Sequence, residues 1–207
     1  MPAITLNSVY FLGIAREAAH RVPQTHPLEP SHDEAIVSVV FAAAAVEAYI
    51  NELAEWETQT QEWITQEQPN APNRQQNVLN ALAQVLNDAE NSRASVTAKY
   101  KLARWILCRS AYDEGANPYQ DFALLMQLRN SLVHLKASAA VIKKLEYRGV
   151  LADDRVDWAG GWTERITTKE MAKWACDSAS AIVCDMIDTI CVAVPNSLHQ
   201  VGRRFWE

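Results

Sequence analysis

Apolar residues recur every three to four positions through almost the whole chain, and proline or glycine interrupts this period at only a few places. This spacing puts side chains on one face of an α-helix, so each uninterrupted segment predicts an amphipathic helix. We expect long helices over about 7–20, 31–68, 74–90, 95–112, 118–136 and 167–194. A short helix is expected near 139–147. The stretch from there to residue 162 predicts a loop or a small hairpin.

The ends of the expected helices carry start and stop signals. The segments 31–34 and 167–170 match the capping box, in which a Ser or Thr hydroxyl accepts from an amide and a Glu reaches back. Prolines stand where a helix must end or begin, at positions 23, 69, 118 and 195 among others. We see no internal repeat and no linker. The sequence predicts a single all-α domain over 1–207, a helical bundle with long antiparallel helices. Its core is expected over about 32–194, with a tail over 195–207.

Composition excludes several classes of protein. Hydrophobic residues make up 49% of the 207 positions, which excludes a disordered chain. Only 6 glycines are present, too few for a fold built on glycine-rich phosphate loops. The net charge of −6 argues against broad coating of nucleic acid, but it leaves room for a local basic site. The four cysteines lack a C-x-x-C spacing, so we expect no disulfide framework, no metal and no cofactor.

The sequence shows no targeting segment. The first residues lack a basic region followed by an apolar run and a cleavage site. The longest apolar run, 36–50, contains Ser38 and Glu47 and is shorter than a membrane span. We therefore expect a cytoplasmic protein with no membrane partner.

The segment 122–136 carries the most chemistry. On a helical wheel its leucines cluster on one face, which must be the core face. Asn130 and His134 are four apart and lie nearly opposite that stripe, and Arg129 lies to one side. The wheel predicts that His134 points away from the core. The residues that it places in the core are Leu128, Leu132 and Leu135.

Two apolar residues, Met126 and Val133, flank the polar triplet on its own side of the wheel. Exposing them to water would be unfavourable, so we expect a two-fold partner to cover them and form a composite cleft. In such a cleft His134 could move a proton, and Arg129 could bind phosphate oxygens. RNA supplies its own nucleophile, the 2′-hydroxyl. Considered alone, the Arg-Asn-x-x-x-His spacing is also common by chance, and a capping or ion-pairing role is the simpler reading.

The string 129–134, near the end of a leucine-rich helix, closely resembles the signature of the HEPN superfamily, an Arg followed four to six residues later by His. The segment 41–53, with Glu47 and Asn51 after small residues, resembles the upstream helix of many bacterial members. The resemblance implies a dimeric helical bundle, often a metal-independent endoribonuclease that leaves a 2′,3′-cyclic phosphate. Such proteins commonly act as toxins in toxin–antitoxin or phage-defence systems, neutralised by an antitoxin.

Carried over by position, the resemblance makes Arg129 and His134 the catalytic pair and Asn130 the assisting residue. Lys136 stands where a subgroup silenced by nucleotidylation has Tyr, so that control is not expected here. Glu47 and Asn51 share a helical face. They either stabilise the bundle internally, or Glu47 anchors Arg129 and Asn51 lines the cleft; a Glu47–Arg129 pair would serve both readings.

Two other readings stay open. A non-catalytic HEPN-like module could use the same polar cluster to bind nucleotide, to contact a protein or to stabilise a dimer, and the acidic balance favours it. An unrelated helical bundle is the third reading. The tail residues 203–206 could stack on bases, although packing or disorder is the simpler expectation for them.

Overall fold

The structure is a computed structural model, and it describes residues 7–23, 33–67, 73–136, 138–151, 162–194 and 203–207. In these ranges every regular element is a helix, which confirms the all-α prediction. The elements in chain order are α1 (Asn7–Arg21), α2 (Asp33–Glu67), α3 (Asn73–Asn91), α4 (Val96–Cys108), α5 (Tyr119–Val133), α6 (Ala139–Tyr147), α7 (Trp162–Arg165), α8 (Lys169–Ala193) and the short 3-10 helix η1 (Arg203–Phe205).

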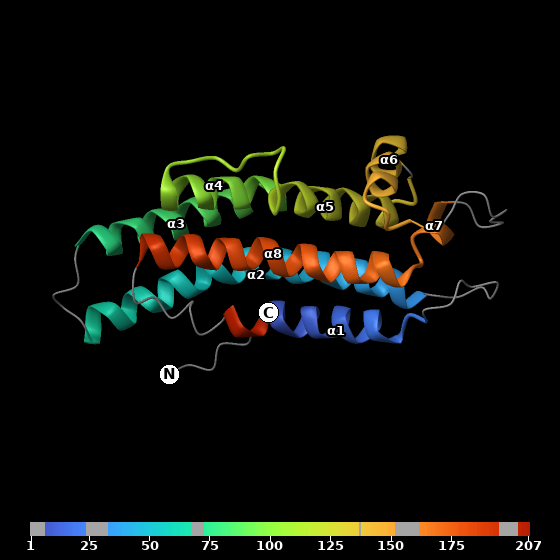
Figure 1. Cartoon of the computed structure of the whole chain (residues 1–207). Coiled ribbons are helices and arrows are strands. Elements are labelled where there is room, and N and C mark those ends of the chain that lie inside the picture. Colours follow the sequence, from blue (N-terminus) through green and yellow to red (C-terminus); the bar gives the residue numbers. More distant parts are fainter. Residues whose placement is uncertain (1–6, 24–32, 68–72, 137, 152–161, 195–202) are drawn as a thin grey trace.

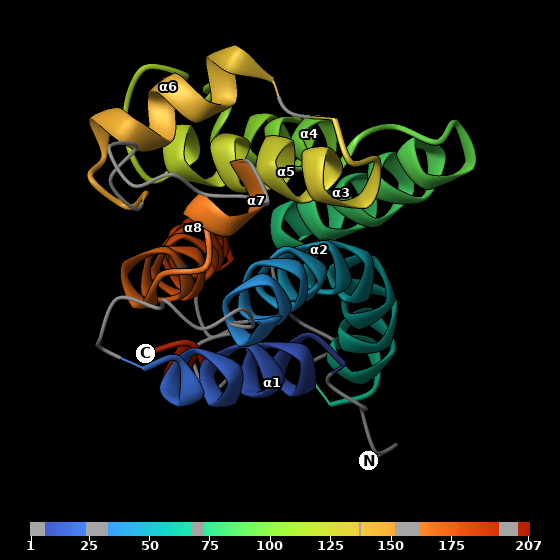
Figure 2. The ribbon, with the colours of Figure 1, turned by 90° about the vertical axis from the view of Figure 1, so that its right-hand side faces the viewer.

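Helices α2 and α8 form the middle of the bundle. Figure 1 shows them side by side, with α4 and α5 along one side and α1 along the other. The end-on view confirms this order and places α6 outside α5 (Figure 2). Helix α2 contacts α1, α3, α4, α5 and α8, so five other helices pack on it.

Alanines make this central position of α2 possible. Ala42, Ala43, Ala45 and Val46 are fully buried in the main core cluster. Small side chains let the backbones of neighbouring helices approach closely, and they lose little side-chain entropy on folding. The alanine run that the sequence analysis took for one part of a functional pattern is therefore the packing surface of the bundle.

A buried carboxylate attaches α1 to α2. Glu52 accepts from the backbone N–H of Ser8 at 3.1 Å and from its hydroxyl at 2.6 Å. Ser8 lies in the first turn of α1, where backbone amides lack partners within the helix and the helix dipole favours a negative charge. Glu52 thus supplies from α2 an acceptor for the first turn of α1. The helical period gave no signal for this contact.

The segment that begins α2 meets a length-and-composition test for a membrane span. Residues Asp33–Glu55 have a mean hydropathy of 1.6, and this segment, which extends beyond the run 36–50 on both sides, is long enough to cross a membrane. Half of the window, however, is buried inside the bundle. A helix at the centre of a bundle meets the same test, and one such helix is weak evidence for a membrane.

The expected helix ends hold to within a few residues, with physical reasons for each shift. Helix α4 stops at Cys108 instead of near 112, because Arg109 adopts a left-handed conformation with φ 54°. Helix α8 is capped by Thr168, whose hydroxyl accepts from the Met171 N–H at 3.0 Å; Thr167 bonds instead to the Glu164 carbonyl. The first capping residue, Ser31, lies outside the described residues. Helix α6 covers Ala139–Tyr147, as predicted.

The described end of the tail packs on the bundle. Trp206 is 2% exposed and meets the Tyr49 ring edge-on, with ring centroids 5.7 Å apart. Arg16 of α1 donates to the carbonyl of Trp206 at 2.7 Å and to that of Phe205 at 3.2 Å. Packing is therefore the role that the structure gives to this segment, and Trp206 is not free to stack on a base.

The alanine surface of α2 gives a first prediction. Ala45→Leu adds three carbons where no space exists and should lower the free energy of unfolding by about 1–3 kcal/mol. The matched control is Ala140→Leu, at an exposed position of α6, which should change stability by less than about 0.5 kcal/mol. Urea unfolding followed by circular dichroism measures both. Equal effects of the two substitutions would contradict the close packing of α2.

Candidate functional site

The polar triplet lies at the C-terminal end of α5. Arg129 and Asn130 belong to its last turns, and His134 is the residue that caps it. His134 and Asn130 are exposed, whereas Leu128 is fully buried and Leu132 is 8% exposed. The prediction that His134 points away from these two leucines is confirmed. Among the described residues, the His134 imidazole and the Arg129 guanidinium therefore both lie at the C-terminal end of α5.

Leu135 was predicted to be in the core, and that prediction is wrong: its side chain is 79% exposed. The helix ends at Val133, so the wheel no longer applies two residues later. Leu135 N–H donates to the Leu132 carbonyl and Lys136 N–H to the Ser131 carbonyl, which is the hydrogen-bond pattern of a Schellman cap. The cap requires a left-handed residue after the helix, and Leu135 takes that place with φ 50°.

Met126 was expected to be exposed beside the triplet, and that expectation is also wrong. It is 6% exposed within this single chain, because α5 is covered by α2, α4, α6 and α8 and buries more than one face. Val133 is 59% exposed, as expected. The exposed apolar surface around the triplet therefore consists of Val133 and Leu135, with no part played by Met126.

Arg129 is held by α2, as the pairing hypothesis required. Its Nη2 donates to Oε2 of Glu47 at 2.9 Å, and its Nη1 donates to Oδ1 of Asn130 at 3.1 Å. The two charged side chains are 32% and 37% exposed, so solvent weakens the pair and its value for stability is small. Its effect is geometric: the guanidinium is fixed between two helices, one edge toward Glu47.

Asn51 does not join this group. Its Oδ1 accepts from Nζ of Lys99 on α4 at 2.7 Å, and the same ammonium pairs with Glu90 of α3. Lys99 is 4% exposed, so a buried cation bridges α2, α3 and α4. A buried ammonium needs such acceptors, and Asn51 is therefore committed to packing. The expectation that Asn51 lines the cleft finds no support in these contacts.

A second polar cluster joins α4 to α8, and the sequence analysis missed it. Asp185 accepts from Arg104 at 2.7 Å and from the Tyr112 hydroxyl at 2.9 Å. The Arg104 guanidinium lies 4.4 Å from the Tyr112 ring centroid. Burial, together with the neighbouring carboxylate, raises the pKa of Tyr112 well above its usual value. Tyr112 therefore keeps its proton across the physiological pH range and donates a hydrogen bond to Asp185. The cluster joins two helices.

The described residues contain no group of three or more His, Cys, Asp or Glu side chains arranged to hold a metal ion. The chemistry available at the end of α5 consists of one imidazole, one guanidinium and one amide. Comparison with models of known families, with curated proteins and with solved structures found no match.

The cap of α5 gives a second prediction. A left-handed non-glycine residue costs about 1–2 kcal/mol, and Leu135 is too exposed to recover this by burial. Leu135→Gly should raise the free energy of unfolding by about 1 kcal/mol, less the entropy that glycine loses on folding. The control Leu135→Ala keeps a Cβ and should leave stability nearly unchanged. The measurement uses protein dilute enough to be monomeric, and a loss of stability in Leu135→Gly there would contradict the strain assigned to this position.

Proposed function

We propose that this protein is a metal-independent endoribonuclease of the HEPN type, acting in the cytoplasm as a toxin of a toxin–antitoxin or phage-defence system. Its substrate would be RNA, its working form a homodimer, and its natural inhibitor an antitoxin protein. Arg129 and His134 would form the catalytic pair, with Asn130 assisting and Glu47 positioning Arg129.

The observation that carries the proposal is the Glu47–Arg129–Asn130 chain of contacts beside an exposed His134. The guanidinium is fixed by a carboxylate on another helix, and a third of its surface remains open. A preorganised cation and an exposed imidazole at the same end of a helix are groups that phosphodiester cleavage can use, one to stabilise charge and the other to move a proton. The Glu47–Arg129 contact joins two segments, 41–53 and 122–136, that the sequence resemblance had singled out separately.

The chemistry needs few groups. His134 would accept the proton of the RNA 2′-hydroxyl while that oxygen attacks the adjacent phosphorus. The bond from phosphorus to the 5′-oxygen then breaks, and the leaving oxygen takes a proton from the imidazolium of the second His134 in the proposed dimer. Arg129 would stabilise the negative charge that builds on the non-bridging oxygens. The products are a 2′,3′-cyclic phosphate and a 5′-hydroxyl, so atoms and charges balance without a metal.

One observation favours a non-catalytic module, the alternative reading. Both amino groups of Arg129 already have acceptors within the chain, one of them a carboxylate that offsets its charge. The chain as a whole carries a net charge of −6, which repels RNA at long range. On this reading the pair would stabilise the bundle or a nucleotide- or protein-binding surface, and no RNA would be cut.

Cleavage assays separate the two readings. His134→Ala and Arg129→Ala should each lower the rate of RNA cleavage by about 10²–10⁴-fold, because one moves a proton and the other stabilises charge. Cleavage should persist in EDTA, leave cyclic phosphate ends and stop when the attacking 2′-hydroxyl is methylated. The readout is the rate on a defined RNA, with growth toxicity measured in parallel.

Matched controls come from the same chain. His20→Ala and Arg93→Ala remove exposed side chains of the same type elsewhere and should leave cleavage unchanged. Equal cleavage by wild type and His134→Ala would point to a contaminating nuclease. An absence of cleavage by every variant, wild type included, would favour the non-catalytic module.

A homodimer through the end of α5 is a separate prediction. The exposed Val133 and Leu135 beside the triplet motivate it, since a second copy would cover both and bring two histidines together. Sedimentation at micromolar concentration should give twice the mass of one chain. Val133→Asp combined with Leu135→Asp should shift the protein toward monomer because burying carboxylates is unfavourable. A dimer that survives this double substitution would be formed through another surface.

A further inference from the structure

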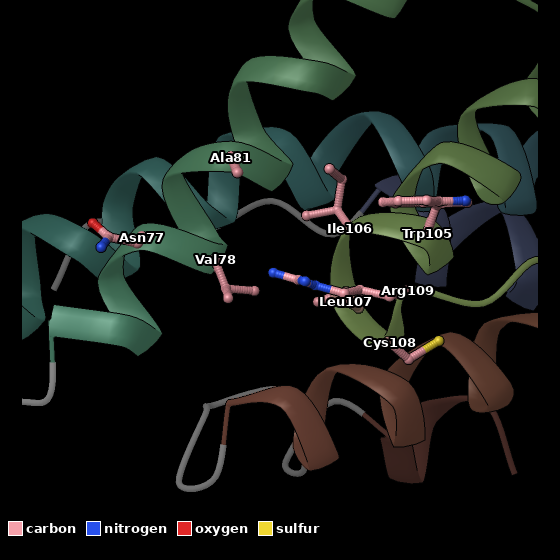
Figure 3. Close-up of a pocket in the computed structure, with 8 residues that line it drawn as sticks. All are labelled: Asn77, Val78, Ala81, Trp105, Ile106, Leu107, Cys108 and Arg109. Carbon is pink, nitrogen blue, oxygen red and sulfur yellow. The ribbon is translucent and has the colours of Figure 1, made fainter.

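A cavity of about 640 Å³ lies between the beginning of α3 and the end of α4, away from the Arg129 site. In Figure 3, Val78 and Ala81 approach it from α3, and Ile106, Leu107 and Arg109 approach it from α4. Its volume falls in the range of small-molecule sites in proteins. Carbon-rich side chains form most of its wall. Its complete lining comprises Asn77, Val78, Ala81, Trp105, Ile106, Leu107, Cys108 and Arg109.

Arg109 brings a single charge to this apolar wall. Figure 3 shows its guanidinium extended across the cavity toward Val78. No acidic residue lines the cavity, and the described residues give the Arg109 side chain neither an ion pair nor a hydrogen bond. Arg104, one turn earlier on the same helix, is by contrast bound to Asp185. Among the described residues, the Arg109 guanidinium thus has no acceptor and faces apolar side chains.

The backbone contributes to this placement. Arg109 follows the last residue of α4 in the left-handed conformation, φ 54°, and its N–H donates to the Trp105 carbonyl at 2.9 Å. Glycine is the usual residue at this position of a helix cap, because a Cβ is unfavourable there. A non-glycine residue with this strain is worth examining for a role of its side chain.

We propose that this cavity binds a small amphiphilic carboxylate, with an acyl or aryl body against the wall and its carboxylate on Arg109. The guanidinium offers two parallel N–H donors that match a carboxylate, and the apolar wall disfavours an anion that is polar throughout. A neutral apolar molecule would leave the cation without a partner. Because the cavity carries one positive charge, we expect its ligand to carry one negative charge.

A second cavity fits this chemistry less well. It measures about 570 Å³ between α1 and α8, and the carboxylates of Asp177 and Glu207 lie in its wall beside the cations and disfavour an anionic ligand. Arg16 is bound to Ser180 and to two carbonyls, and Lys173 pairs with Asp177. The cavity at α1 and α8 therefore serves as the internal comparison for where a ligand binds.

Octanoate tests the proposal on the wild-type protein. In ¹H–¹⁵N NMR spectra, a titration below the micellar concentration should shift the amides of Val78, Ala81, Ile106 and Arg109 in a saturable manner. Acetate, which has the charge without the apolar body, and octanol, which has the body without the charge, should each bind at least tenfold more weakly. Shifts that scatter over the surface, that centre on Arg16 or that fail to appear would overturn the proposal.

Two arginine variants supply the decisive comparison. Arg109→Gln should weaken octanoate binding about tenfold or more, as expected for loss of a charge-assisted hydrogen bond, and leave octanol binding unchanged. Arg93→Gln is the matched control, since Arg93 is also exposed and left-handed, with φ 56°, and it does not line the cavity. Equal octanoate affinity in both variants would contradict the role of Arg109.

A third variant tests the cavity itself. Ala81→Phe places a ring in the space between α3 and α4 and should abolish binding, while thermal unfolding shows that the protein stays folded. Full octanoate affinity in a folded Ala81→Phe protein would place the ligand elsewhere and overturn the proposal.

Discussion

The packing of small side chains along α2 is the constraint on which the rest of the structure depends. Five helices contact α2, and its alanines leave no room for anything larger at the points of contact. Polar contacts are then placed on this frame at defined positions: Glu47 meets Arg129, Asn51 meets Lys99 and Glu52 meets Ser8. One helix thus supplies both the apolar surface that assembles the bundle and the acceptors that orient its neighbours.

Much of the fold could be predicted from the sequence because helical period, prolines and capping residues are local signals. Residues 139–147 and the all-α architecture were found in this way. The errors occurred where a tertiary contact or a backbone turn decides. Met126 is buried by neighbours that a wheel of one helix does not contain, and Leu135 is exposed because the helix ends before it and Leu135 itself is left-handed.

Part of the candidate site could also be predicted from the sequence. The Glu47–Arg129 pair followed from asking which cation could balance a carboxylate in an alanine-rich segment. For Asn51 the sequence left two readings open, a contact inside the bundle and a place in the cleft, and its bond to Lys99 is a contact of the first kind. The Asp185 cluster and the Glu52 cap gave no local signal, since each joins residues that are more than forty positions apart.

The buried ammonium of Lys99 fixes α3 and α4 to each other at one end, and this has a mechanical consequence for the other end of the two helices. Glu90 and Lys99 join α3 to α4 next to the turn between them, and Asn51 fixes that joint to α2. At the other end of this pair Val78 and Arg109 line the cavity, and the described residues there form no hydrogen bond or ion pair between the two helices. Lys99 is therefore a fixed point, or pivot, about which a tilt of α4 would change the width of the cavity. The arm of α4 beyond the pivot is about 14 Å long, so a tilt of about 4° opens or closes its tip by about 1 Å.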